Sequence, residues 1–368
     1  MRISNIKIAR LKIPLIRPFI TALRRTDHVE DIVLIIGTDT GLVGYGSAAS
    51  TPVITGDSQE SVIGALQLLA NKLIGVELAN FEEILRQVNT GLVNNNSAKA
   101  AADIAIHDLV AKSMRLPLYK LLGGGKPELK ILSTVSVKDV SEMVSDAKLF
   151  VSQGFETLKI KVGLNPEEDI GRIKAIRDAV GKKINIVSDA NQGWDAKSAL
   201  RIINTLVENE LDIAMVEQPV KAWDYDNLKF VRDNSALPIY ADESVFSVRD
   251  VLKVISGSYA DGVNIKLMKS GGIYAARTIY DLATAHNLPC MAGCMLESPI
   301  GLAAMASFVV GRANIKFIDL DPITMIKINP VKGGVILNGA ALTLSEGYGL
   351  GIDHVDGLEI LISINNAS

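Results

Sequence analysis

Polar residues recur at nearly regular intervals in the second half of the chain, each at the end of a short apolar run typical of a buried β-strand. They are Asp189 in INIVSDAN, Glu217 in IAMVEQP, Asp242 in PIYADES and Lys266 in GVNIKL, at intervals of 28, 25 and 24 residues. Each interval accommodates one helix, one strand and two short loops. Because strands that alternate with helices form parallel sheets, this repeat predicts a parallel (β/α) barrel.

The alternation of strands and helices begins near residue 130 and predicts eight strands. Helical periodicity fills the gaps between them, as in PEEDIGRIKAIRDAV and GGIYAARTIYDLATAH. We expect the strands near residues 131–137, 157–162, 184–189, 213–217, 238–242, 262–267, 289–294 and 315–320.

The N-terminal part of the chain has a different pattern. Residues 1–47 alternate apolar and polar side chains around a turn at 39–41, which predicts a β-meander. Residues 58–88 and 97–115 carry helical apolar spacing, and we expect Asn96 or Ser97 to cap the second helix.

Three glycines and a proline in LPLYKLLGGGKPE mark a boundary between two units. A chain of 368 residues is long enough for two such units. We place an α+β unit at residues 1–125, the barrel at 126–324, and a strand-rich segment at 325–368 that returns to the first unit.

Composition excludes several classes of partner and compartment. The net charge of −3 gives no reason to expect a nucleic-acid or anionic-membrane partner, and no apolar run approaches the roughly 18 residues of a membrane span. The N-terminus MRISNIKIARLKIPL lacks a signal-peptide pattern, so we expect a cytoplasmic protein. Cys290 and Cys294, taken as one strand, would lie about 13 Å apart, too far for a disulfide.

The carboxylates at the strand ends predict a metal site. In parallel barrels the carboxyl ends of the strands converge on one mouth, so Asp189, Glu217 and Asp242 should lie together. Mg²⁺ prefers carboxylates plus water or substrate oxygens, and Mn²⁺ suits the same ligands. A single Asp before a loop often caps a helix, but three carboxylates at consecutive strand ends favour a metal ion.

Three lysines accompany the carboxylates. Lys159 and Lys161 lie two residues apart in LKIKV and therefore point the same way, toward the barrel interior. Lys266 lies four strands further round, roughly opposite. An inward setting beside another ammonium predicts a lowered lysine pKa, which a base working near neutral pH requires. Two lysines across a metal site predict that one removes a proton and the other delivers one to the opposite face.

The motifs LKIKVG, DANQGW, VEQP, ADES and NIKLMKSGG, in this order and spacing, resemble the enolase superfamily in its muconate-lactonizing-enzyme subgroup. The resemblance spans essentially the whole chain. It implies an α/β fold, a modified TIM barrel of (β/α)7β type with an α+β capping domain formed by the N-terminal segment and the C-terminal tail. The mandelate-racemase subgroup would place a histidine late in the barrel, whereas His286 lies in a predicted helix.

The resemblance also implies a reaction: abstraction of a proton α to a carboxylate, giving an enediolate stabilised by Mg²⁺. By the same resemblance, Lys161 and Lys266 are the acid/base pair and Lys159 stabilises the enediolate. The implied Mg²⁺ ligands are Asp189, Glu217 and Asp242.

Asp319 and Asp321 in KFIDLDP indicate a substrate class. Two residues apart at the end of the eighth predicted strand, they should share a face about 6–7 Å apart. Two like charges there favour a cation such as a substrate ammonium, although a helix cap or a surface pair is the alternative. In the family, this Asp-x-Asp pattern resembles that of dipeptide epimerases, which bind the α-ammonium of the dipeptide there.

Further residues are assigned to the substrate by resemblance. Arg24 in PFITALRR resembles the arginine of L-Ala-D/L-Glu epimerases that pairs with the glutamate side chain, and Arg25 is the alternative. Ile54 in TPVITGDS and Thr134 on the first barrel strand are expected to contact substrate. Glu297 in MLESP belongs to the same pattern but receives no role.

We therefore expect a Mg²⁺-dependent dipeptide epimerase, of the L-Ala-D/L-Glu type, that inverts the α-carbon of the C-terminal residue and serves in turnover of peptidoglycan peptides. An o-succinylbenzoate synthase or N-acylamino acid racemase would share the lysines and metal ligands, but its substrates, like those of muconate cycloisomerase, lack a free ammonium. A non-catalytic relative is disfavoured by the three lysines. Barrels of this family often assemble, and the sequence leaves a homo-oligomer open.

Overall fold

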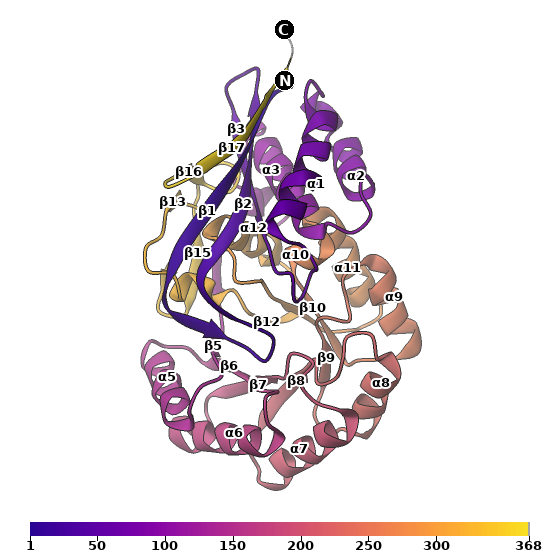
Figure 1. Ribbon diagram of the computed structural model, residues 1–368, viewed down its shortest axis with the longest axis vertical. Coiled ribbons are helices and arrows are strands. Elements are labelled where there is room, and N and C mark those ends of the chain that lie inside the picture. The colour runs from indigo at the N-terminus through magenta and orange to yellow at the C-terminus, as the bar shows by residue number, and fades with distance from the viewer. Residues whose placement is uncertain (367–368) are drawn as a thin grey trace.

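The computed structural model describes residues 1–366, and an eight-stranded parallel sheet curled into a barrel is its largest element (Figure 1). Neighbouring strands follow the order of the sequence, and a 2.9 Å hydrogen bond from Leu132 N to Ile318 O joins the first and last. The strands are β5 (Ser133–Val135), β6 (Thr157–Lys161), β7 (Asn185–Asp189), β8 (Ile213–Glu217), β9 (Ile239–Ala241), β10 (Gly262–Ile265), β11 (Cys290–Ala292) and β12 (Ile315–Ile318). All eight predicted strands are confirmed, each slightly shorter than or equal to its predicted range.

Helices surround the strands on the outside of the barrel (Figure 1). Local sequence starts several of them: Asp195, for example, accepts hydrogen bonds of 3.0 Å from the backbone of Lys197 and Ser198. The helices are α5 (Val140–Ser152), α6 (Pro166–Val180), α7 (Ala196–Glu208), α8 (Tyr225–Asn234), α9 (Val248–Gly257), α10 (Leu267–Ser270), α11 (Ile273–Ala285) and α12 (Pro299–Val309).

The alternation of side chains along each strand builds both the floor and the mouth of the barrel. Val187, Met215 and Tyr240 point inward and form a buried apolar cluster with Leu132 and Met291. The next inward positions along the same strands hold the three predicted carboxylates, because successive inward side chains are two residues apart. The strand period therefore places an apolar floor directly beneath a polar mouth.

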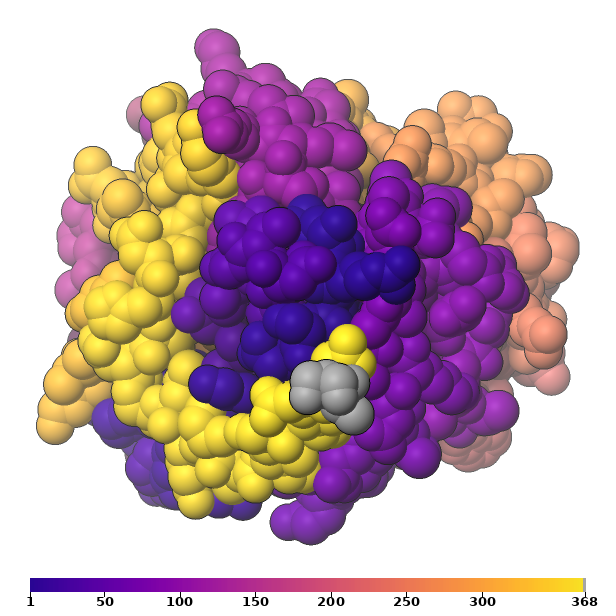
Figure 2. All heavy atoms as spheres, turned by 90° about the horizontal axis from the view of Figure 1, so that it is seen from above, coloured from indigo at the N-terminus to yellow at the C-terminus, as the bar shows by residue number. Residues whose placement is uncertain are grey.

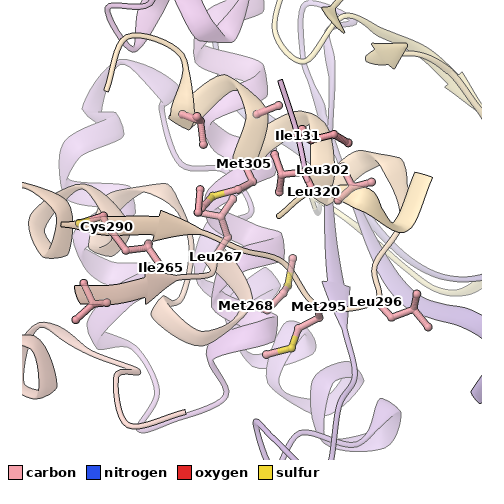
Figure 3. Packing of buried hydrophobic residues seen from close by; sticks show 14 of the residues in the cluster. Ile131, Ile265, Leu267, Met268, Cys290, Met295, Leu296, Leu302, Met305 and Leu320 are labelled. Carbon is pink, nitrogen blue, oxygen red and sulfur yellow. The ribbon is translucent and has the colours of Figure 1, made fainter. Parts of the chain in front are cut away.

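A second apolar layer lies between the barrel wall and the helices outside it. Leu302 and Met305 of α12 pack near Leu320, and Ile265 and Leu267 lie in the same cluster (Figure 3). Met295 and Leu296 follow β11 and lie at the edge of this layer (Figure 3). Burial of this apolar surface fixes the barrel strands relative to their helices.

The N-terminal unit is an antiparallel sheet backed by helices. Its strand order is β17-β1-β2-β3, so the last strand of the chain pairs with the first, as predicted for the returning segment. Yellow C-terminal residues accordingly lie beside indigo N-terminal ones (Figure 2). The elements are β1 (Ile3–Ile20), β2 (Arg25–Thr38), β3 (Val43–Ala49), α1 (Gln59–Leu73), η1 (Leu78–Asn80), α2 (Phe81–Thr90), α3 (Asn96–Ser113), α4 (Leu118–Leu121) and β17 (Glu359–Asn365).

Short elements link the two parts of the chain. After β12, the turn η2 (Asp321–Thr324) leads into strands that pair with one another or with β4. The predicted domain limits at 125/126 and 324/325 stay predictions. These strands are β4 (Glu128–Lys130), β13 (Val331–Gly333), β14 (Val335–Asn338), β15 (Ala341–Leu344) and β16 (Ile352–Val355).

The predicted cap of α3 is wrong. The N-cap residue is Asn95 in a left-handed conformation, and its side chain makes no capping bond. Instead, Asp57 Oδ2 accepts a 3.1 Å hydrogen bond from Ser97 N, so a distant carboxylate satisfies the helix N-terminus. Local sequence gives no sign of this partner.

Buried carboxylates of the N-terminal unit hold it against the barrel. Asp31 on β2 accepts a 2.9 Å hydrogen bond from Ser298 N, at the start of α12. Asp103 on α3 accepts bonds of 2.6 Å from Ile273 N and 3.2 Å from Tyr274 N, at the start of α11. Each carboxylate thus satisfies amide groups at a helix N-terminus in the other unit.

The tip of the β1–β2 hairpin also reaches the barrel (Figure 1). Val137 N donates to Ile20 O at 3.3 Å, and Arg17 lies 2.6 Å from Asp146 on α5.

None of the helices within residues 1–366 combines the length and the hydrophobicity that a membrane-spanning helix requires.

His107 provides a test of the setting of Asp103, the carboxylate that binds the start of α11. It is buried beside Asp103, with Nδ1 2.9 Å from the Asp103 carbonyl and 3.2 Å from its carboxylate. Burial lowers the pKa of His107, but the charge and hydrogen bonds of Asp103 outweigh burial and raise it above its ordinary value. A raised pKa means that protonated His107 stabilises the fold below the unfolded value of about 6.5, and that this contribution disappears as pH rises through the folded pKa.

We therefore predict that His107→Gln destabilises the protein by about 2 kcal/mol at pH 5.5, the worth of a hydrogen bond to a charged group, and by clearly less at pH 9. Urea unfolding at both pH values measures this difference. His286→Gln, at an exposed position, is the control. A pH-independent difference for His107→Gln would contradict the ion pair.

Candidate active site

Three buried carboxylates converge at the mouth of the barrel. Asp189 ends β7, Glu217 ends β8, and Asp242 directly follows β9. One oxygen from each lies within 4.8 Å of the others, and all three residues are fully buried. The convergence predicted from strand-end spacing is present.

The lysines lie among these carboxylates. Lys159 Nζ contacts three groups: Asp189 at 2.9 Å, Glu217 at 2.7 Å and Asp319 at 2.8 Å. Lys161 Nζ lies 2.6 Å from Asp189, while Lys266 Nζ lies 2.7 Å from Asp242. Lys161 at the end of β6 and Lys266 directly after β10 therefore approach the cluster through different carboxylates.

The lowered pKa predicted for the lysine pair of β6 is wrong for Lys159, and the pKa of Lys266 is raised as well. Burial does lower the pKa of each, but the surrounding carboxylates outweigh burial and raise both above the ordinary lysine value. For Lys159 the main contributors are Asp189, Asp319 and Glu217. The prediction considered only the apolar setting and the neighbouring ammonium. In the structure, three carboxylates contact the ammonium of Lys159, and they favour its charged form.

The carboxylates respond in opposite directions. Burial and the charge of Asp189 raise the pKa of Glu217 to about 8, against the opposing effect of Lys159. Burial raises the pKa of Asp189, but Lys159 and Lys161 outweigh it and lower that pKa to about 2. The neighbouring lysine ammonium groups therefore stabilise the ionised form of Asp189 more than that of Glu217.

Several polar residues of the site were missed by the sequence argument. Lys269 is buried, lies 2.6 Å from Asp242 and donates to Asn264 O at 3.0 Å. Asn191 accepts from Lys161 at 3.1 Å and donates to Glu243 at 3.1 Å, while Asn264 donates to Glu217 at 2.7 Å. The signals were present, because each of these residues lies within three positions of a predicted site residue.

A cavity opens onto the lysines and is closed on one side by the N-terminal unit. Phe19, Thr21, Arg24 and Ile54 line it from that unit. Arg25 begins β2, is exposed and is not among the lining residues, so Arg24 is the arginine at the site. From the barrel the lining residues include Thr134, Lys159, Lys161, Asn191, Lys266, Met295, Leu296, Asp319, Asp321 and Met325.

The Asp319–Asp321 pair lies in this cavity, but its backbone setting differs from the prediction. Strand β12 ends at Ile318, and Asp321 begins the η2 turn, so the two residues do not share a strand face. Asp319 contacts Lys159, whereas Asp321 Oδ2 accepts a 2.5 Å hydrogen bond from Thr134 N. Burial and then the charge of Asp319 raise the pKa of Asp321 to about 7, as expected for a carboxylate beside a like charge.

Glu297 lies outside this cavity. It is buried, and burial followed by the charge of Asp31 raises its pKa well above the ordinary value. Cys290 and Cys294 are both free thiols, as predicted, although β11 ends at Ala292 and the two do not lie on one strand.

Comparison with known proteins assigns the fold and its family. Residues 4–123 match the mandelate racemase / muconate lactonizing enzyme N-terminal domain, and residues 142–356 match the enolase C-terminal domain-like family. The chain belongs to the enolase superfamily. The capping unit and the barrel are thus the two domains characteristic of that superfamily.

Individual relatives cover nearly the whole chain. The L-Ala-D/L-Glu epimerase of Clostridium acetobutylicum is 44% identical, over 97% of this chain and 100% of that protein. The L-Ala-D/L-Glu epimerase of Bacillus subtilis, solved as a substrate-liganded complex, is 42% identical with a TM-score of 0.95, over 96% of this chain and 99% of that one. A dipeptide epimerase of Enterococcus faecalis, solved with Mg and L-Leu-L-Tyr, is 38% identical with a TM-score of 0.92, over 96% and 100%. This enolase-superfamily protein is accordingly an isomerase.

The carboxylate cluster suits a divalent cation. Its donors are hard oxygens in a buried setting, the type that Mg²⁺ prefers. Glu217 Oε2 and Asp242 Oδ1 accept no hydrogen bond from residues 1–366, although the ammonium groups of Lys159 and Lys269 lie 2.7 and 2.6 Å away. A divalent ion would therefore share these two oxygens with the ammonium groups of Lys159 and Lys269.

We predict that Mg²⁺ stabilises the protein. Binding to the native state alone at 100 times its dissociation constant adds about 2.7 kcal/mol to the free energy of unfolding. Thermal unfolding with increasing MgCl₂ measures this effect. Glu217→Gln should remove most of it, whereas Glu210→Gln, at an exposed position, should not. Equal stabilisation of both variants would place the ion elsewhere.

Proposed function

We propose that this protein is a Mg²⁺-dependent dipeptide epimerase of the L-Ala-D/L-Glu type. It inverts the α-carbon of the C-terminal residue by removing its proton on one face and returning a proton on the other. The observation that carries the proposal is the Asp319–Asp321 pair in the same cavity as Lys161 and Lys266. The relatives named above support the same activity. Turnover of peptidoglycan peptides in the cytoplasm stays a prediction.

The aspartate pair favours a substrate with a free ammonium. Two buried carboxylates in one cavity repel each other, and a cation between them removes that repulsion. Of the two aspartates, Lys159 contacts Asp319 and not Asp321, so Asp321 faces the cavity without a cationic side chain within ion-pair distance among residues 1–366. N-acylated amino acids and muconates carry no α-ammonium and would leave the carboxylate of Asp321 without a cation. This disfavours the racemase and cycloisomerase alternatives.

Arg24 favours an acidic side chain on the second residue. Burial lowers the pKa of Arg24, and no carboxylate of residues 1–366 forms an ion pair with it. Within residues 1–366, the guanidinium of Arg24 donates one hydrogen bond, to Thr51 Oγ1 at the long distance of 3.5 Å. A partly buried guanidinium without an acidic partner gains from a substrate carboxylate, which it can bind through two parallel hydrogen bonds.

The lysines supply the proton transfers. For a substrate held between them, the neutral form of one lysine takes the α-proton, and the ammonium of the other donates to the opposite face. A divalent ion on the carboxylates would offset the negative charge that raises the pKa of Lys266 and so would favour its neutral form. Lys159, beside the carboxylates, places positive charge next to the developing enediolate. A divalent ion on Asp189, Glu217 and Asp242 would supply Lewis-acid stabilisation of the substrate carboxylate. Ile54 and Thr134 close the cavity around the substrate.

The first experiment is a dipeptide library in deuterated water with Mg²⁺, read by mass spectrometry. We expect a one-dalton gain on L-Ala-L-Glu and little on dipeptides with a cationic second residue. Lys161→Ala and Lys266→Ala should each lower epimerisation by at least about 10²-fold, because a positioned acid or base contributes about 10²–10⁴-fold. One-sided exchange on a single stereoisomer would identify which face each lysine serves.

Lys174→Ala, at an exposed position on α6, is the matched control and should react as the wild type does. Near wild-type activity in both site variants would exclude the two-lysine mechanism. No exchange on any dipeptide, with exchange on N-succinylamino acids, would favour the N-acylamino acid racemase alternative.

Asp321 should impose a pH dependence on substrate binding. Its pKa of about 7 means that the carboxylate is ionised above that pH and neutral below it. An ammonium binds the ionised form, so KM for L-Ala-L-Glu should rise as pH falls from 8 to 6. Asp321→Asn should lower kcat/KM about 100-fold at pH 8 and abolish this dependence.

Steady-state kinetics across this pH range measure the effect, with exposed Asp281→Asn as control. An unchanged KM profile in Asp321→Asn would remove Asp321 from ammonium binding.

A further inference from the structure

A second cavity lies beside the candidate active site. It has a volume of about 400 Å³ and lies between the tip of β1, helix α5, the η2 turn and β14. Its lining is largely apolar and comes mainly from side chains that no part of the proposed reaction uses, such as Ile16, Leu149, Phe150, Phe155 and Leu337. The rings of Phe150 and Phe155 pack edge to face at 6.0 Å.

The two cavities share a wall. Phe19, Thr134 and Met325 line both of them. Phe19 lies near the end of β1, at the hairpin tip, and Met325 directly follows η2. Methionine adapts its shape readily, so this wall can yield to a side chain that enters from the active site.

The aspartate pair sets the direction in which a substrate side chain would point. Thr134 N donates to Asp321, so an ammonium bound at Asp321 lies next to the shared wall. The rest of the dipeptide must run from there toward Lys161 and Lys266, where the α-proton is exchanged. The side chain of the N-terminal residue starts one bond from the carbon that carries the ammonium, and it therefore borders Thr134.

We infer that the second cavity is a subsite for the side chain of the N-terminal residue and that it accepts large apolar side chains. This inference rests on the proposed function. The apolar lining favours aliphatic and aromatic groups. The charged residues that line the cavity are Arg17, Lys138 and Asp146, and each of the two cations lies 2.6 Å from the one carboxylate. Because this group carries a net positive charge, it disfavours a lysine or arginine side chain in the cavity.

The test compares kcat/KM for L-Ala-L-Glu, L-Leu-L-Glu, L-Phe-L-Glu and L-Lys-L-Glu. The subsite predicts values for the leucine and phenylalanine dipeptides at least equal to that for L-Ala-L-Glu, and at least tenfold above that for L-Lys-L-Glu. Turnover of L-Ala-L-Glu with a tenfold loss for leucine and phenylalanine would overturn the subsite and leave the proposed function intact. No turnover of any dipeptide would overturn both.

Variants that fill the second cavity test whether it binds a substrate side chain or has no role in substrate binding. Leu149→Trp should lower the ratio of kcat/KM for L-Phe-L-Glu over L-Ala-L-Glu at least tenfold. Leu252→Trp on α9 is the matched control, because the two leucines are 43% and 44% exposed, and it should leave the ratio unchanged. Gln153→Phe fills the same cavity from an exposed position and should act as Leu149→Trp does. An unchanged ratio in both cavity variants would overturn the subsite.

Discussion

The mouth of the barrel depends on a balance of buried charge centred on Lys159. One ammonium contacts the carboxylates of Asp189, Glu217 and Asp319, which come from three different strand ends. Removing such charges from water costs several kcal/mol per ion unless each finds a partner. The barrel supplies those partners because its strands hold successive inward side chains in register, so the chemistry of the mouth is a consequence of the closed sheet.

The N-terminal unit completes the site through the same kind of interaction. Asp31 and Asp103 are buried in that unit, yet their partners are backbone amides at the starts of α12 and α11 in the barrel. These bonds fix where the β1–β2 hairpin lies, and the hairpin carries Phe19 and Arg24 to the cavity. Under the proposed function, selectivity for the substrate rests on residues whose position is set by the interface between the two units.

The sequence predicts those parts of the site that local periodicity determines. Asp189 and Glu217 could be placed at the mouth because each ends a recognisable strand. The raised pKa of Lys159 was missed although Asp189, Glu217 and Asp319 were all placed at strand ends, because their direct contacts with its ammonium form only when the barrel closes. The cap of α3 failed for the same reason, since Asp57 replaces a local side chain. Lys269 was overlooked although it follows Lys266 by one helical turn.

Under the proposed function, the charges of the cavity also set the length of the substrate. The aspartate pair holds the ammonium, Asp189, Glu217 and Asp242 would hold a divalent ion that stabilises the α-carboxylate, and the proton is exchanged between Lys161 and Lys266. The terminal ammonium and carboxylate of one molecule must therefore span a single cavity, which a dipeptide does. A longer peptide would leave one terminus without its partner, and a buried unpaired charge costs more than any added contact at the rim returns. Variation is left to the side chains, one facing Arg24 and the other facing the wall of Phe19, Thr134 and Met325.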